Sequence, residues 1–358
     1  MNAPFVPARA AIRLMNIADP GEAARLEAFV AQHPQGTPFH RPAWLSAVAA
    51  GSGNRALALV AEQSAELTGY LPLLEVHSPL FGRVLVSSGF GVDGGMLVDA
   101  HGAESGLFAA VEELALRRSC PSIELRGGVL PQDRPGWKVR HDTHCGFVTD
   151  LADDEAAQLL AIPRKQRAEV RKGLAGSLKI ETGTGPRDRA AHYAVYAESV
   201  RNLGTPVFPR ALFDEVLDSF GDDADILTVR DDGAPVASVL SLYHKGAVMP
   251  YWGGGTQAAR GLRANDRMYF ELMLHAARRG CTRFDFGRSK TGSGAYDFKR
   301  SWGFEPRPLG YASWTAPGSQ PRDADPTSAK HAARIALWRK LPLALANRLG
   351  PPIARGLA

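Results

Sequence analysis

The sequence predicts an α/β protein with mixed, largely antiparallel sheets, whose two halves repeat one order of secondary structure. Apolar residues recur with helical spacing in some segments and with strand-like spacing in others. The chain has 358 residues, 45% of them hydrophobic, so two domains can each bury a core. The order helix, antiparallel strands, helix, strand precedes residue 151 and returns after it. We therefore expect domains at residues 1–150 and 151–318 and a tail at residues 319–358.

The first half follows this order with short connections. Gly51 and Gly53 end its second helix, and residues 64–66 join two strands into a hairpin. The predicted helices cover residues 21–33, 43–53 and 104–117, and the predicted strands cover residues 57–62, 67–76, 82–88, 95–98 and 122–126.

The second half adds helices and one strand before a three-stranded meander. Turn sequences at residues 231–233 and 245–246 separate the meander strands, and Gly280 closes the helix that follows them. The predicted helices cover residues 155–173, 186–202, 209–220 and 263–279, and the predicted strands cover residues 178–181, 226–230, 235–244, 247–252 and 282–286.

Composition argues against several classes of protein. Cys120, Cys145 and Cys281 are odd in number and widely spaced, which favours neither a disulfide framework nor a metal site. No apolar run approaches the roughly 20 residues that span a bilayer, and the first residues lack the pattern of a signal peptide. We therefore expect a cytoplasmic protein.

The basic charge of the chain comes from its tail. The formal net charge is +5, but no acidic residue follows Asp325. Removing the six tail cations from the 42 basic residues leaves 36 against 37 acidic residues, so we expect no specific DNA binding. Residues 332–349 mix these cations with large apolar side chains, which fits a helix packed on the body or one lying on an anionic membrane. The cations are Lys330, Arg334, Arg339, Lys340, Arg348 and Arg355.

Residues 283–311 hold the densest group of candidate functional side chains. A strand leads into a glycine-rich loop, where backbone N–H groups can approach a ligand, and cations beyond it can hold a carboxylate, a phosphate or a developing oxyanion. Asp285 would orient Lys299 or take a proton from an attacking amine, or else cap the core. The alternative for the whole segment is a surface loop with core aromatics. The candidates are Asp285, Arg288, Tyr296, Phe298 and Lys299.

A basic stripe opens the second half. Arg164, Arg167 and Arg171 fall at i, i+3 and i+7 of a predicted helix, and Lys172 extends the stripe. Such a stripe suits a nucleotide or lipid diphosphate, or a tRNA backbone, and the alternative is a solvated helix face. Pro163 at the helix start leaves free N–H groups for an anion.

The order meander, helix, strand is that of the GNAT acyltransferase core, where a splay between central strands admits the acyl donor and the next helix points its N-terminus at phosphates. The sequence also resembles the FemAB-like branch of the GNAT superfamily, and within it proteins encoded beside the exosortase (XrtA)/PEP-CTERM system of Gram-negative bacteria. The resemblance covers nearly the whole chain and rests on PFHRPAWL (38–45), HSPLFGRVLVSSGF (77–90), PRKQRAEVRKGL (163–174), LRANDRMYFELMLHAARRGCTRFDFGRSK (262–290) and AYDFKRSWGFEP (295–306).

This resemblance implies two tandem GNAT-like domains and transfer of an acyl or aminoacyl group to an amine. Fem ligases take aminoacyl-tRNA as donor and a peptidoglycan precursor as acceptor, and their Phe–Lys pair at the reaction centre looks like Phe298 and Lys299 here. The lysine would hold an acceptor carboxylate or stabilise the tetrahedral oxyanion. The resemblance also favours phosphate binding by the basic stripe. We expect no tightly bound cofactor, a small-molecule or lipid-linked phosphorylated acceptor, and a place in the cytoplasm or at the inner face of the membrane.

The sequence leaves two candidates for the acyl donor, aminoacyl-tRNA and acyl-CoA. A standard GNAT has Q/R-x-x-G-x-G/A before its phosphate-binding helix, whereas residues 260–265 read RGLRAN. Arg263 and Asn265 lie in this segment and Trp252 precedes it, and these three complete the candidate substrate-binding residues. Two further hypotheses are a coenzyme A-dependent N-acetyltransferase and a non-catalytic binding protein. His40 and His77 are weaker candidates for a base, and a packing role is the more common one for a lone histidine.

Overall fold

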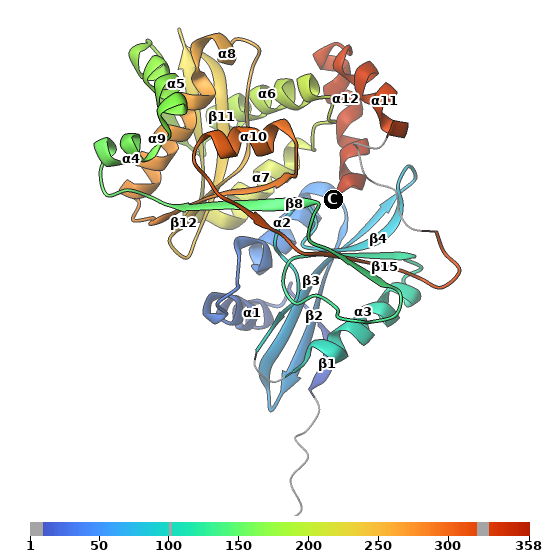
Figure 1. Ribbon diagram of the computed structural model, residues 1–358. Coiled ribbons are helices and arrows are strands. Elements are labelled where there is room, and N and C mark those ends of the chain that lie inside the picture. Colours follow the sequence, from blue (N-terminus) through green and yellow to red (C-terminus); the bar gives the residue numbers. More distant parts are fainter. Residues whose placement is uncertain (1–9, 100–101, 321–328) are drawn as a thin grey trace, which may run out of the picture.

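The computed structural model describes residues 10–99, 102–320 and 329–358, and these form two sheets with helices around them (Figure 1). The first sheet has the strand order β1-β2-β3-β4-β6-β15-β7, with β5 beside β3. The second sheet has the order β14-β8-β13-β12-β11-β10-β9. Both sheets are mostly antiparallel with one parallel pair, so the predicted class and the mixed sheets are confirmed.

The strands of the first sheet come from both ends of the chain. They are β1 (Ala11–Met15), β2 (Arg55–Gln63), β3 (Glu66–Ser78), β4 (Gly82–Ser87), β5 (Leu97–Val98), β6 (Ser122–Arg126), β7 (Trp137–Arg140) and β15 (Tyr311–Thr315). The strands of the second sheet are β8 (His144–Asp150), β9 (Lys179–Gly183), β10 (Ala224–Asp231), β11 (Ala234–His244), β12 (Ala247–Gly255), β13 (Arg283–Lys290) and β14 (Pro306–Pro308).

Helices form in the segments where apolar spacing predicts them, and the structure has further helices that were not predicted. The first half has α1 (Pro20–Gln32), α2 (Pro42–Ser52) and α3 (Glu104–Arg117), with a 3₁₀ turn η1 (Pro38–His40). The second half has α4 (Glu155–Ala161), α5 (Arg164–Ala175), α6 (Pro186–Leu203), α7 (Arg210–Phe220), η2 (Gly221–Asp223), α8 (Ala259–Leu262), α9 (Ala264–Arg278) and α10 (Gly294–Ser301). The tail has α11 (Ala329–Arg339), α12 (Leu343–Ala354) and η3 (Arg355–Leu357).

Two predicted features need correction. The single helix expected over residues 155–173 is divided into α4 and α5 at Ile162 and Pro163, because proline cannot continue a helix and restricts the residue before it. The glycine-rich loop expected around residues 292–294 is short, since α10 begins at Gly294 with Ser293 as its N-cap.

Two segments cross between the halves. The strand β8 pairs with β13 in the second sheet, although it lies before residue 151, and β15 returns from the second half to pair with β6 and β7 in the first sheet. Figure 1 shows both segments running between the two halves. The second sheet therefore contains a strand from before residue 151, and the first sheet contains a strand from after it.

The one parallel pair in each sheet is short. β12 and β13 pair only at Ala247↔Arg283 and Val248↔Phe284, and β4 and β6 pair only at Leu85↔Ile123 and Val86↔Glu124. Beyond these positions the neighbouring strands diverge. The second sheet therefore has the splay that we expected between its central strands.

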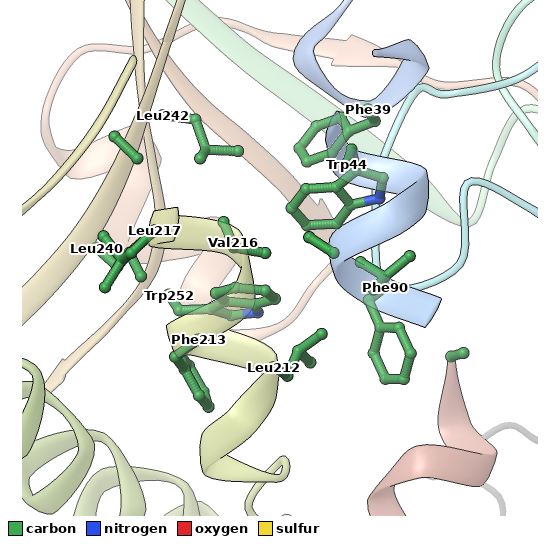
Figure 2. Close-up of a cluster of buried hydrophobic side chains, with 14 of the residues drawn as sticks. Phe39, Trp44, Phe90, Leu212, Phe213, Val216, Leu217, Leu240, Leu242 and Trp252 are labelled. Carbon is green, nitrogen blue, oxygen red and sulfur yellow. The ribbon is translucent and has the colours of Figure 1, made fainter. Parts of the chain in front are cut away.

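One hydrophobic core joins the halves (Figure 2). Trp44 on α2 of the first half stacks on Trp252 on β12 of the second, with ring centroids 5.7 Å apart, and both are almost fully buried. Phe213 on α7 meets the other side of this pair, 4.8 Å from Trp252. The halves therefore share one apolar core in addition to the cores that each half encloses by itself.

The tail packs on the body. Arg339 Nη2 of α11 donates to Leu203 O at the end of α6 (3.2 Å), and Asn54 Nδ2 donates to Arg355 O (3.0 Å). Ala358 is buried in the core that joins the halves. This is the first of the two placements considered for the tail. Within the described ranges, no helix has the length and hydropathy needed to cross a membrane.

We predict that Trp44→Ala destabilises the whole chain as one unit. Removing a buried tryptophan from the shared core should lower the free energy of unfolding by about 3–5 kcal/mol. Urea unfolding followed by circular dichroism should show one transition for wild type and variant. The control is Leu116→Ala, at a side chain 58% exposed, which should change stability by less than about 0.5 kcal/mol. Separate transitions for the two halves would contradict the shared core.

Candidate active site between the two halves

The site is built around a β-bulge in β13. This strand pairs with β8 at Asp285↔Val148 and again at Arg288↔Gly146, so two residues of β13 oppose Phe147 alone. Gly287 lies in the bulge with φ +65°, a backbone conformation that glycine adopts without strain. Its N–H donates to Asp285 Oδ1 (2.8 Å), which fixes the carboxylate beside the bulge.

Lys299 on α10 binds the outer side of this bulge. Its Nζ donates to Arg288 O (2.8 Å) and Gly287 O (3.2 Å) and lies 5.4–5.5 Å from the ring centres of Phe147 and Phe286. Burial lowers the pKa of Lys299 to about 8, although the Asp285 carboxylate raises it. A protonated lysine has three N–H donors, so one remains for a substrate oxygen.

Two carboxylates share this environment, one from each half. The pKa of Asp285 is raised to about 6, mainly by burial and in part by the charge of Asp93, against the hydrogen bond from Gly287 N and the charge of Lys299. Burial also raises the pKa of Asp93 itself. The Asp93 carboxylate lies so close to Gly127 that a Cβ there would be 1.8 Å from Oδ1, which explains the glycine. Asp93 is thus a member of the site that the sequence analysis missed.

A glycine-rich loop of the first half carries Asp93 to the site. Ser88, Phe90 and Asp93 all have positive φ, between 43° and 62°, which is costly for side chains other than glycine. The loop is held by Tyr251, whose hydroxyl donates to Phe90 O, and by Arg126, whose Nη1 donates to Gly91 O (3.1 Å). A carboxylate between glycines was the only sequence signal for this residue.

Arg288 joins the two sheets next to the bulge. Its Nη1 donates to the hydroxyl of Tyr311 on β15 (3.0 Å), and His144 lies 4.9 Å from the Tyr311 ring. Burial lowers the pKa of His144 to about 4, and Arg288 and Arg126 lower it further, so this histidine is neutral at pH 7. Arg288 therefore donates to a neutral hydroxyl beside a neutral histidine, whereas Arg126 pairs with the Glu124 carboxylate (2.8 Å).

The aromatic candidates Phe298 and Tyr296 pack against aromatic residues next to the bulge. Phe298 packs among Tyr269, Phe286 and Trp302 in the core of the second half. Tyr296 on the same helix lies edge-on to Phe147, 5.5 Å between ring centres. Both residues therefore lie near Lys299, and their rings pack beside the bulge.

The side chains of the basic stripe on α5 differ in exposure and in hydrogen-bond partners. Arg164, Arg171 and Lys172 are exposed, and Lys172 pairs with Glu169 (2.7 Å). Arg167 instead donates to the carbonyls at the end of α4, Leu160 O (2.8 Å) and Ile162 O (2.9 Å). Its guanidinium therefore connects α4 to α5.

The remaining candidates lie around the segment between β12 and α9. Arg263 precedes α9 with φ 57° and pairs with Glu169, and it lines a pocket of about 290 Å³ with Lys172 and Ser177. Asn265 Oδ1 is buried near Gly255 with no hydrogen-bond partner among the described residues. Trp252 belongs to the shared core. Among the candidates, Lys172 and Arg263 form one group at this pocket and those of β13 and α10 form another at the bulge, while the rest belong to neither.

The histidines considered as bases have other roles. His40 is buried, accepts from Thr37 N (3.1 Å) at Nδ1 and donates to Gly95 O (3.0 Å) from Nε2. His77 is exposed on β3. In the part of the chain that the structure describes, no cluster of three or more His, Cys, Asp or Glu side chains has the arrangement of a metal site.

Comparison with known proteins supports the fold. Residues 142–300 match the acetyltransferase (GNAT) domain family, a range that contains β8, the bulge of β13 and Lys299. No curated protein sequence matches the chain.

Solved structures extend the likeness to both halves. FemX has a TM-score of 0.65 at 15% identity, over 82% of this chain and 96% of that one. A tandem GNAT protein from the clavulanic acid biosynthesis pathway has a TM-score of 0.56 at 14% identity, over 87% of this chain and 100% of that one. L-PGS from Bacillus licheniformis has a TM-score of 0.52 at 14% identity, over 90% and 96%. The fold is therefore a tandem GNAT-like one, as predicted.

We predict that Lys299 titrates near pH 8 and depends on Asp285. Competitive labelling with a trace amine reagent, read by mass spectrometry, should be half-maximal near that pH. Asp285→Asn removes the carboxylate that favours the ammonium form, so labelling should become half-maximal at a lower pH. Asp297→Asn makes the same change at an exposed carboxylate of α10 and should leave the curve in place. An upward shift in Asp285→Asn would refute the coupling.

We also predict that the stripe on α5 divides by function. Arg167→Ala should lower the free energy of unfolding by about 1–2 kcal/mol, because two carbonyls lose a charged donor. Arg164→Ala and Arg171→Ala should change stability by less than about 0.5 kcal/mol and should weaken retention of tRNA at low salt. Urea unfolding and filter binding measure the two effects. Equal losses of stability in all three variants would contradict the division.

Proposed function

We propose that the protein is an acyl- or aminoacyltransferase that moves an activated acyl group onto an amine of a cell-envelope or exopolysaccharide-related acceptor. The observation that carries this proposal is the ammonium group of Lys299, held by two bulge carbonyls near the Asp285 carboxylate. The GNAT domain match over residues 142–300 supports the same class of reaction.

The groups at the bulge suit attack of an amine on an acyl carbonyl. With a pKa of about 8, Lys299 is mostly protonated at pH 7, and its third N–H can stabilise the oxyanion. With a pKa of about 6, Asp285 is mostly ionised and can take the proton of the attacking amine. The new C–N bond forms, the bond from the acyl carbon to the donor breaks, and the proton passes to the leaving group. Asp93 raises the basicity of Asp285 through its charge.

Aminoacyl-tRNA is the donor that we favour. Residues 260–265 depart from the Q/R-x-x-G-x-G/A loop that holds the pyrophosphate of coenzyme A, and Arg263 there pairs with Glu169. The exposed cations Arg164 and Arg171 on the neighbouring α5 suit a polyanionic backbone. The resemblance to Fem ligases and the fold shared with FemX support the same donor.

The acceptor is proposed to carry phosphate and an amine. Arg288 and Lys299 offer cations at the bulge, so a phosphorylated small molecule or lipid-linked sugar fits there, whereas Lys172 and Arg263 at the pocket both pair with Glu169. The resemblance to proteins encoded beside the exosortase/PEP-CTERM system supports an envelope or exopolysaccharide precursor. The enzyme would then work in the cytoplasm, at the inner face of the membrane.

A coenzyme A-dependent N-acetyltransferase is the second candidate. The splay of β12 and β13 after two residue pairs favours it, because an acyl-pantetheine arm binds between such strands in the GNAT core. Under this alternative Lys299 and Asp285 keep their roles and the leaving group is a thiol. A binding protein without catalysis is the third.

Thermal-shift measurements with acetyl-CoA, charged tRNA and a UDP-linked sugar-peptide should separate these candidates. We expect stabilisation by charged tRNA and by the sugar-peptide. Stabilisation by acetyl-CoA alone would favour the second candidate, and no stabilisation by any donor would favour the third.

We predict that Lys299→Ala lowers kcat/KM by about 10²- to 10³-fold in the transfer assay so identified, because the oxyanion loses its donor. Most of the loss should fall on kcat, and the thermal shift by donor should persist. Lys138→Ala removes an exposed lysine of β7 and should leave the rate unchanged. A fully active Lys299→Ala would refute the catalytic reading.

A further inference from the structure

The helix α12 contacts the body through its smallest residues. Ala346, Gly350 and Ala354 are buried and follow one another at spacings of four. A Cβ on Gly350 would lie 2.9 Å from Val207 N and 3.1 Å from Val207 O. The helix therefore lies directly against the backbone of the body, and this face has no room for larger side chains.

Other large apolar side chains of the tail are exposed, although Leu343 packs on the core that joins the halves and Ile335 lies against Gly204. Leu345 and Leu349 on α12 are each 43% exposed, and Leu337 on α11 is 66% exposed. Leu345 and Leu349 are four positions apart and so lie on one face, which the exposed Pro352 continues. A helix held only by packing on the body would bury its leucines and expose its alanines. The outward face therefore has the composition of a second contact surface.

Cations surround this outward face. Arg334, Lys340 and Arg348 are exposed, and Arg348 lies on the same turn of α12 as the two leucines. No acidic residue follows Asp325 in the sequence. A second copy of the chain would bring like charges together, whereas an anionic lipid surface offers both negative charge and apolar depth.

We propose that α11 and α12 dock on an anionic lipid bilayer, with the leucines in the interfacial region and the cations at the headgroups. The two placements considered for the tail are then compatible, because opposite faces of α12 contact the body and the lipid.

The docking surface is joined to the candidate site. Beyond α12, Arg126 Nη2 donates to Ala358 O (2.9 Å), and the same guanidinium donates to Gly91 O in the loop that carries Asp93. Docking of the tail would thus bring the bulge close to the bilayer. A lipid-linked acceptor fits this arrangement, a consequence that rests on the proposed function, while lipid binding itself does not.

Cosedimentation of the full chain with vesicles tests the docking without any substrate. Binding should be strong to phosphatidylcholine vesicles containing phosphatidylglycerol and weak to phosphatidylcholine alone. Leu345→Ser with Leu349→Ser should lower the partition coefficient by about tenfold or more, and Arg334→Glu with Arg348→Glu by about fivefold or more per cation. The control is Leu116→Ser, at a leucine 58% exposed on α3, which should bind like wild type.

Three results would overturn the proposal. One is equal binding of wild type to neutral and anionic vesicles, or none to either. Another is unchanged binding by both tail variants, with thermal unfolding showing them folded. The third is a homodimer in light scattering that Leu345→Ser with Leu349→Ser converts to monomer, which would assign the surface to a second copy. Loss of transfer activity with retained vesicle binding would refute only the proposed function.

Discussion

The site depends on the place where β13 leaves β12. The two strands share only two residue pairs, so the rest of β13 has no neighbour on that side and is held from the other side by β8. The extra residue that forms the bulge is tolerated because Gly287 takes a positive φ. The carbonyls of Gly287 and Arg288 then lie free of the ladder and accept from Lys299. The buried ammonium of Lys299 therefore donates to carbonyl oxygens and not to a carboxylate. The Asp285 carboxylate can then still accept a proton.

The two halves are needed together for this arrangement. Asp93 reaches the bulge from the first half, on a loop whose three positive φ values are costly unless neighbours hold them. Those neighbours come from both halves, since Tyr251 belongs to β12 and Arg126 to β6. Two strands, β8 and β15, cross between the halves, and the core around Trp44 is shared by both. These contacts hold the loop that carries Asp93 in position relative to the bulge. The stability of the chain and the geometry of the site therefore have a common origin.

Local patterns predicted most of the regular structure, and long-range pairing accounts for what they missed. The helix over residues 104–117 and the strand over residues 122–126 appear with their predicted bounds, because strong apolar periodicity and clear end signals agree there. The strands β1, β7, β8, β14 and β15 were not predicted. They are short or polar. The strand β15 forms because it pairs with β6 and β7, which are more than 170 residues away in the sequence. The helix α10 was missed since glycine and serine at its start indicate a loop.

Chemistry was harder to predict than architecture. Lys299 and Phe298 were selected through the family resemblance, and Asp285 through its place between two aromatic residues. The pairing of Asp285 with Asp93 could not be predicted, because a carboxylate among glycines has the signature of a turn. Helical spacing grouped Arg167 with its neighbours. Spacing does not predict that its guanidinium donates to carbonyls at the end of α4.

The divergence of β12 and β13 also relates the two groups of candidates. The strands begin side by side and end apart, β12 at the segment that lines the pocket with Arg263 and Lys172, and β13 at the bulge that binds Lys299. A donor with phosphate at one end and an activated carbonyl at the other can therefore contact both groups only by lying along the opening between these strands. Because both strands are parallel, their carboxyl ends lie at the same edge of the sheet. This opening is the place where the acyl-pantetheine arm of coenzyme A would lie under the second candidate function, with its phosphates and its thioester at opposite ends.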